Sequence, residues 1–231
     1  MSWAEKCDED LNRLCNESAA WKEFQDYERT WTPEGHRFRR AQMDRFFVPN
    51  RRDCWAYVQA RSPIDVKQAI WRHEQDELIH DARIGMSHVD LIDRSDNAEP
   101  LPGVQTACWA WLYIAAHSPW LEALASSHIL ERANDPTVIK GGTGNQRDAE
   151  ELMKRMNLQR VEDLPVEARA HLDADTDHSN LIWEVMVRYI TDEESYNQVM
   201  RGARASREIF KTLRQGIALA EMDLQRNLAR V

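Results

Sequence analysis

Glycine and proline are scarce in this sequence, and their scarcity narrows the range of possible folds. Each occurs eight times in 231 residues, whereas alanine, leucine, glutamate, arginine and glutamine are plentiful. Because those five residues favour helices while glycine and proline interrupt them, the composition favours a mostly helical protein. A chain of this length can also bury one substantial core. We therefore expect an all-α fold organised as a single domain over residues 1–231.

Paired cysteines and long apolar runs are also lacking. The four cysteines contain no C-x-x-C pair, so neither a zinc ribbon nor a disulfide framework is indicated. The most apolar run, ACWAWLYIAA at residues 107–116, is shorter than the roughly 20 residues that span a bilayer. The first residues, MSWAEKCDEDLNRL, are acidic and lack the apolar centre of a signal peptide. We expect a cytoplasmic protein with no membrane partner.

An excess of basic residues is absent as well. The formal net charge is -9 at pH 7, which argues against nucleic acid as a partner because non-specific binding relies on a basic surface. The Gly-rich stretch KGGTGNQRD at 140–148 lacks the Gly-Lys-Ser/Thr that opens the helix of a phosphate-binding P-loop. We interpret this stretch as a flexible connection.

Helical patterns fill most of the chain. Apolar residues recur at spacings of three and four, and no repeat of 20–50 residues or low-complexity tract is visible. The stretch SPIDVKQAIWRHEQDELIHDARIGMSHVDLIDR at 62–94 predicts one long helix, with Ser62 as its N-cap and Pro63 at its first position. We expect about seven helices and no sheet.

The segment EARAHLDADTDHSNLIWEVM at 167–186 concentrates histidine and aspartate before a hydrophobic run. In a helix at about 100° per residue, His171 and Asp175 lie about 40° apart, and His178 lies about 60° back from Asp175. All three therefore share one face. Two imidazoles and a carboxylate are a ligand set suited to iron or manganese. The same residues also fit a solvated acidic face with chance histidines.

A second polar face occurs in IWRHEQDELIHDARIG at 70–85, where His73, Glu77 and His80 lie at spacings of four and three. Glu77-x-x-His80 has the Glu-x-x-His spacing of di-iron carboxylate sites in helical bundles. The alternative is an exposed face with pairs three and four residues apart. Glu131 adds a carboxylate at the end of an otherwise apolar helix. Three helices that each carry carboxylates or histidines of this kind are a rarer coincidence than one such helix alone.

Together these residues resemble the haem-oxygenase-like di-metal oxidases and oxygenases, an all-α seven-helix group related in fold to haem oxygenase and to TenA- and PqqC-type proteins. The resemblance implies two bound iron ions held by Glu77, His80, Glu131, His171, Asp175 and His178. Glu77, Glu131 and Asp175 would be the catalytic carboxylates that offset the metal charge. The ligand from the first helix remains open among Glu77, Glu74, His73 and Asp44, and His88 is an alternative to His80. Iron and manganese also remain open.

The resemblance further implies an O2-dependent enzyme of specialised-metabolite biosynthesis. Its substrate would be a small amino acid or derivative, which undergoes N-oxygenation, desaturation or oxidative C–C cleavage. An external electron donor and a homodimer are expected. The alternatives are a fatty-acid oxidative decarboxylase of the same family, a metal-free enzyme related to TenA and PqqC, and a non-catalytic helical interaction protein. Arginine is suited to bind a substrate carboxylate, and Arg188 is our first candidate for that role.

Overall fold

The chain folds into a bundle of α-helices, described in a computed structural model that covers residues 1–29, 32–91 and 98–228. These residues form no β-strand, and an isolated bridge between Asp81 and Met86 is the one extended pairing among them. The expected all-α fold is confirmed. The α-helices are α1 (Trp3–Ala19), α2 (Lys22–Arg29), α3 (Pro33–Gln42), α4 (Val48–Arg61), α5 (Ile64–Leu78), α6 (Pro102–His117), α7 (Trp120–Arg132), α8 (Gly144–Met156), α9 (Val166–Met186) and α10 (Glu193–Leu228).

Four short elements complete the described part of the chain. They are the π-helix η1 (Met43–Phe47) and the 3-10 helices η2 (His88–Leu91), η3 (Val161–Asp163) and η4 (Val187–Tyr189). Helices α3, η1 and α4 follow one another without a break, so residues 33–61 form one continuous rod. If that rod is counted once, seven helices build the main bundle, with α2 and α8 added to it.

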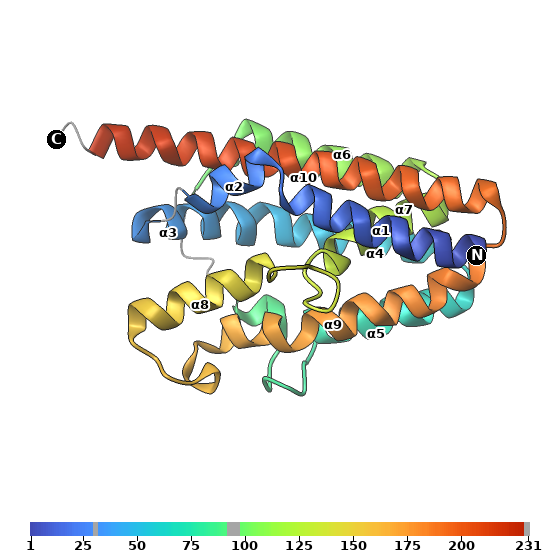
Figure 1. The fold of residues 1–231 in the computed structure, drawn as a ribbon, viewed down its shortest axis with the longest axis horizontal. Helices are drawn as coiled ribbons and strands as arrows, with labels where there is room; N and C mark the ends of the chain where they lie inside the picture. The colour runs from blue at the N-terminus through green and yellow to red at the C-terminus, as the bar shows by residue number, and fades with distance from the viewer. Residues whose placement is uncertain (30–31, 92–97, 229–231) are drawn as a thin grey trace.

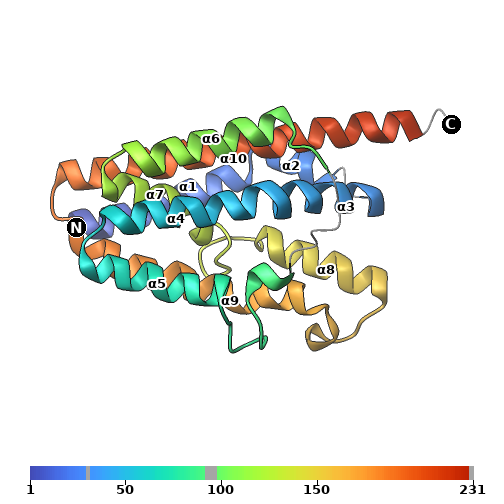
Figure 2. The same cartoon turned by 180° about the vertical axis from the view of Figure 1, so that it is seen from behind.

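Helix α7 occupies the middle of the bundle. It packs against α10 and α6 on one side and against α9 on the other. Figures 1 and 2 show α10 running along one side next to α6, whereas α5 and α9 lie side by side on the opposite side. Every residue of α7 from 123 to 130 is buried. A polar side chain near the end of this helix is therefore held inside the protein.

Glycine allows α10 to approach α7 closely. A Cβ atom at Gly202 in α10 would lie 2.0 Å from the carbonyl oxygen of Glu122 in α7. A real Cβ atom does not lie so close to another atom, so the two backbones approach this closely only because residue 202 has no side chain. A milder approach joins α6 and α10, where a Cβ at Gly216 would lie 3.2 Å from the Cα of Gly103.

The prediction of one long helix over 62–94 is wrong, because α5 ends at Leu78. The backbone turns at Ile79, and Asp81 then organises the turn by accepting hydrogen bonds from the backbone and the side chain of Arg83. The chain returns toward the bundle in η2. Ser62 is not the N-cap of α5 either, because its hydroxyl donates backwards to the carbonyl oxygen of Val58 at the end of α4.

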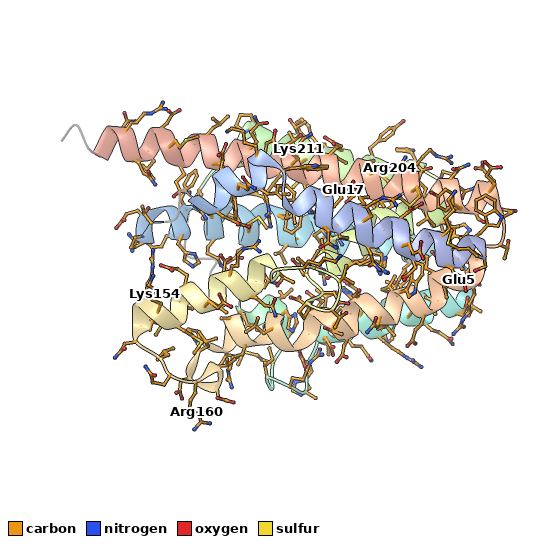
Figure 3. The ribbon with its side chains drawn as sticks, viewed as in Figure 1. Glu5, Glu17, Lys154, Arg160, Arg204 and Lys211 are labelled. Carbon is orange, nitrogen blue, oxygen red and sulfur yellow. The ribbon has the colours of Figure 1, made fainter. Side chains whose placement is uncertain are left out.

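The outer surface is strongly charged. Figure 3 shows the labelled side chains of Lys154 and Arg160 at the edge of the molecule, and those of Glu17 and Arg160 are 66% and 69% exposed. Among the described helices, none is long and apolar enough to cross a membrane.

Candidate metal centre

Three side chains from three helices converge inside the bundle. His73 of α5, Glu131 of α7 and His178 of α9 each offer a ligand atom, and these atoms all lie within 4.8 Å of one another. The imidazole rings of His73 and His178 have their centroids 4.5 Å apart. The Nε2 atom of His73 lies 3.7 Å from Oε1 of Glu131. Two imidazoles and a carboxylate thus surround one point.

The orientation of the His73 ring suits a metal ligand. Its Nδ1 atom lies 2.9 Å from Oε1 of Glu74, a carboxylate that can accept a hydrogen bond from the N–H of that nitrogen. Its Nε2 atom is buried, faces Glu131 and has no hydrogen-bond partner among the described residues. An imidazole whose one N–H is held by a carboxylate presents the lone pair of the other nitrogen, which is the usual arrangement at metal sites. The residues present therefore fit a bound metal ion.

The electrostatics of this group are those of a charged pair held away from water. Burial alone would lower the pKa of His73, but the neighbouring carboxylates of Glu131 and Glu74 raise that pKa to about 9. Burial would raise the pKa of Glu131, but His73 and Arg51 hold it well below its ordinary value. Without metal, a proton on His73 partly offsets the carboxylates. A metal cation would replace that proton.

A second group of ligand-type side chains adjoins the first. Nδ1 of His88 in η2 lies 3.1 Å from Oε1 of Glu77 in α5, and its Nε2 lies 2.8 Å from Oδ2 of Asp81. Nδ1 of His178 lies 3.6 Å from the same Oε1 of Glu77. The carboxylate of Glu77 therefore stands between two imidazoles. It connects the two groups.

Asp175 of α9 belongs to the same region. It is only 5% exposed and accepts a hydrogen bond of 2.8 Å from the side-chain amide of Asn145 in α8. Burial raises the pKa of Asp175 well above its ordinary value, and the neighbouring charges of Glu131 and Glu77 raise it further. A nearby cation would reverse that shift, because it would stabilise the ionised carboxylate.

Both groups open onto one cavity of about 230 Å³. Its lining includes Glu77, His88, Glu131, Asp175 and His178. Arginines also line it, and two of them hold the carboxylates: Arg51 lies 3.3 Å from Glu131, and Arg52 lies 2.8 Å from Glu77. Carboxylates, imidazoles and open space thus occur together, which is what a metal centre that binds a substrate requires.

Comparison with known proteins bears on the fold. No protein-family model matches the chain, and no curated protein sequence matches it. Among solved structures, it is similar to a CADD-like protein of unknown function from Nostoc punctiforme. The TM-score is 0.70 at 14% identity, and the alignment covers 94% of this chain and 97% of the other. The chain has a CADD-like helical fold. At this identity the likeness concerns the fold alone.

Within this CADD-like bundle, four of the six predicted ligands line the cavity: Glu77, Glu131, Asp175 and His178. The structure corrects the position of a fifth. His80 lies beyond the end of α5, is exposed, and is absent from the cavity lining, because the helix that would have carried it inward stops at Leu78. The side chain of the sixth, His171, lies outside the described residues.

Two histidines take places that the spacing did not assign to them. His73 had been one of several alternatives for the first helix, and it provides a fully enclosed imidazole, at 0% exposure. His88 had been an alternative to His80, and η2 brings it into contact with Glu77. The signal for His88 is present in the sequence as Gly85, whose φ of 77° lies in the turn after α5, and as Ser87 and Asp90. The hydroxyl of Ser87 donates to the carboxylate of Asp90 and stabilises the turn.

The other candidates occupy supporting positions or lie elsewhere. Asp44 is buried at the cavity and pairs with Arg40 at 3.0 Å, and Glu74 orients His73 while it pairs with Arg52. Arg188 is not a candidate for a substrate carboxylate, because its side chain is 60% exposed beside Asp65 and it does not line the cavity.

Proposed function

We propose that this protein is a non-haem di-iron enzyme that uses O2 to oxidise a small amino-acid-derived substrate. The observation that carries the proposal is the convergence of His73, Glu131 and His178, with the unpartnered Nε2 atom of His73 directed at Glu131. An unpaired nitrogen buried between two potential ligands is costly without a bound group. A non-catalytic interaction protein would have no use for it.

The side chains divide into two ligand groups. His73, Glu131 and His178 would hold one iron, and Glu77, His88 and Asp175, with His171, would hold the other. Since Glu77 contacts both His88 and His178, it is suited to serve both ions. When bound, two iron ions with histidine and carboxylate ligands and open positions supply the activation of O2.

The surrounding residues orient the ligands and control their charge. Arg51 and Arg52 fix the carboxylates of Glu131 and Glu77, so these groups do not rearrange freely as charge in the site changes. Asn145 fixes Asp175 in the same way. The enclosure of the ligands among packed helices limits access of water to the reacting atoms. The resemblance to di-metal oxidases adds amino acids as the substrate class, with fatty acids as the alternative.

Metal binding can be tested by anaerobic titration with Fe(II), followed by determination of bound iron. We expect up to two ions per chain in the wild type. His178→Ala and His171→Ala should each lose about one ion, because removal of one ligand from a site with few ligands greatly weakens binding. Mn(II), titrated in parallel, identifies the preferred metal. Unchanged iron content in His178→Ala would contradict the proposal.

Catalysis can be tested by mixing the Fe(II) protein with O2 in a stopped-flow instrument, with and without candidate amino acids and fatty acids. Products are identified by mass spectrometry. We expect O2 consumption and a transient visible absorbance in the wild type, and neither in Glu131→Ala. Glu184→Ala, which removes an exposed carboxylate of α9, is the matched control and should behave like the wild type. Turnover in Glu131→Ala equal to that of the wild type would mean that the site is misplaced.

A further inference from the structure

The cavity contains an arginine that no metal ligand uses. Arg214 of α10 lines it, with the guanidinium over the rings of Phe24, Tyr27 and Phe210 at 4.3, 5.1 and 4.6 Å from their centroids. Aromatic faces hold a guanidinium in place but leave its N–H donors unused. Arg214 is therefore fixed in direction while its hydrogen-bonding capacity is open.

No carboxylate among the described residues accepts a hydrogen bond from Arg214. The nearest is Glu28, whose Oε1 lies 4.0 Å away and already accepts a hydrogen bond of 2.7 Å from Arg147. Asp148 also lines the cavity and interacts with Arg214 over a longer range. Burial lowers the pKa of Arg214, which reflects the cost of holding its charge away from water. A bound anion would offset that cost.

The beginning of α8 adds two further donors at the same place. Thr143 caps the helix and accepts from the backbone N–H of Gln146, so that donor is satisfied. The N–H groups of Gly144 and Asn145 precede the first intrahelical bond and have no acceptor in the described part of the chain. A Cβ at Gly144 would lie 3.7 Å from Nη2 of Arg214. The positive end of a helix and a guanidinium therefore adjoin one another.

This arrangement gives the Gly-rich stretch at 140–148 a role. Gly141 and Gly142 have φ values of 85° and 90°, which residues with side chains rarely adopt, and they bring Thr143 into position to cap α8. Gly144, without a side chain, leaves the space next to Arg214 open. The stretch is not a P-loop, yet Gly144 and Asn145, whose backbone N–H groups have no acceptor in the described part of the chain, line the cavity, and such donors at a helix N-terminus suit an anion.

We propose that Arg214 and the first turn of α8 form an anion subsite that binds the carboxylate of the substrate, in the same cavity as the metal ligands. The assignment of the cavity to a substrate rests on the function proposed above. A carboxylate suits the subsite better than a phosphate, because Glu28 and Asp148 lie near Arg214 and repel a doubly charged group more strongly than a singly charged one. A planar guanidinium also matches the two oxygens of a carboxylate.

The test measures binding of three probes that each have six carbons in an unbranched chain: hexanoate, hexanamide and hexyl phosphate. Isothermal titration calorimetry is performed on the anaerobic Fe(II) protein and on the metal-free protein. We expect the wild type to bind hexanoate at least about tenfold more tightly than hexanamide, since a charge-assisted hydrogen bond contributes about one factor of ten or more. Arg214→Gln should lose this preference in both forms. Arg188→Gln, which removes an exposed arginine, should keep it.

A second pair of variants tests the helix terminus without any change of charge. Gly144→Pro removes one N–H at a helix position that accepts proline, and the extended backbone of Thr143 is compatible with a following proline. Gly144→Ala keeps the N–H and adds a Cβ atom at the position where proline also has one. We expect Gly144→Pro to weaken hexanoate binding several-fold more than Gly144→Ala does, and to leave hexanamide binding less affected.

The outcomes separate this proposal from the proposed function. If the protein binds no iron but discriminates hexanoate from hexanamide through Arg214, the subsite stands and the di-iron function fails. If iron binds but Arg214→Gln keeps the preference for hexanoate, the subsite is overturned and the function stands. Equal binding of hexanoate and hexanamide by the wild type, or no binding of any probe, also overturns the subsite. Tighter binding of hexyl phosphate than hexanoate overturns the assignment to a carboxylate.

Discussion

His128 is a histidine whose burial gives it a structural role. It lies on α7 one turn before Glu131, its Nε2 atom is 3.0 Å from the carbonyl oxygen of Ser179, and its ring stacks on Trp183. Its Nδ1 atom is buried and has no partner within the described residues. Burial and the charge of Arg132 lower the pKa of His128 to about 3. The folded protein therefore keeps this ring neutral.

This histidine should make the protein sensitive to acid. Because the unfolded chain binds the proton near pH 6.5 and the folded chain only near pH 3, the free energy of unfolding should fall as the pH drops below 6.5. For this group alone the loss between pH 7 and pH 5 is about 2 kcal/mol. His128→Gln, which can still donate to Ser179, should lose correspondingly less over the same range. Urea denaturation at both pH values measures the difference, and an identical loss in both proteins would refute the prediction.

His88 and His80 offer a direct comparison of the two positions proposed for one ligand. His88 is buried against Glu77 and Asp81, whereas His80 is exposed. We expect His88→Ala to lower the iron content by about one ion per chain, because one ligand is removed from a site with few ligands. His80→Ala, the matched control, should bind iron like the wild type. The opposite result would restore the position that the helical spacing had suggested.

At the scale of elements, the contact between α7 and α10 should be intolerant of any side chain at Gly202. A Cβ there would lie 2.0 Å from the backbone oxygen of Glu122 and 3.2 Å from the backbone nitrogen of Ser126, and neither atom can rotate away. The helices would have to separate. Gly202→Ala should therefore destabilise the protein by about 2–4 kcal/mol, despite the better helix propensity of alanine.

The control for this substitution is Gly216→Ala in the same helix. Its Cβ would lie 3.2 Å from the Cα of Gly103, which requires a shift of a few tenths of an ångström. We expect a change within about 1 kcal/mol. Urea midpoints with unchanged m-values compare the two variants. Equal effects would show that the bundle adjusts as readily at Gly202 as at Gly216.

Helix ends decided which parts of the site could be predicted from the sequence. Asp175 and His178 lie within α9, so a spacing of three in sequence became proximity in space. Glu77 and His80 had the same spacing, but α5 ends between them at Leu78. That end depends on Asp81 and Arg83, whose bonds form only once the turn exists. A periodic pattern of residues does not show whether the helix continues or gives way to such a turn.

At the scale of the whole molecule, the proposed ligands connect segments that are far apart in the chain. His73, His88, Glu131 and His178 come from α5, η2, α7 and α9. A metal that binds them binds only the folded arrangement, because the unfolded chain does not bring them together. Fe(II) under anaerobic conditions should therefore raise the Tm, by several degrees at saturating metal, and a chelator should reverse the rise.

The control for this effect is a chain with impaired ligand groups. The double variant His73→Ala and His178→Ala should show little rise in Tm with Fe(II). Differential scanning fluorimetry at several metal concentrations is sufficient. If the wild type and the double variant gained the same stability, the metal would be binding elsewhere.

Composition and periodicity were enough to predict the all-α fold, because few glycines and prolines interrupt the helices. They could not predict which helices meet. The central place of α7 depends on a backbone approach at Gly202 that only the folded structure reveals. The anion subsite was missed for a related reason: Arg214 is separated by about 70 positions from Gly144, and nothing in their spacing connects them. The single-domain arrangement and the homodimer stay predictions.

The π-helix η1 fixes the rotational phase between the two halves of the rod formed by residues 33–61. A π-turn contains one more residue than an α-turn, so the side chains before it are rotated by about 100° relative to an uninterrupted helix. Arg39 and Arg40 before this turn and Arg51 and Arg52 after it all line the cavity. Loss of a single residue within 43–47 would restore regular α-helix and turn one of these sets away. The shape of the cavity thus depends on one inserted residue, so a single deletion would change the side chains that line the cavity while the helices stay intact.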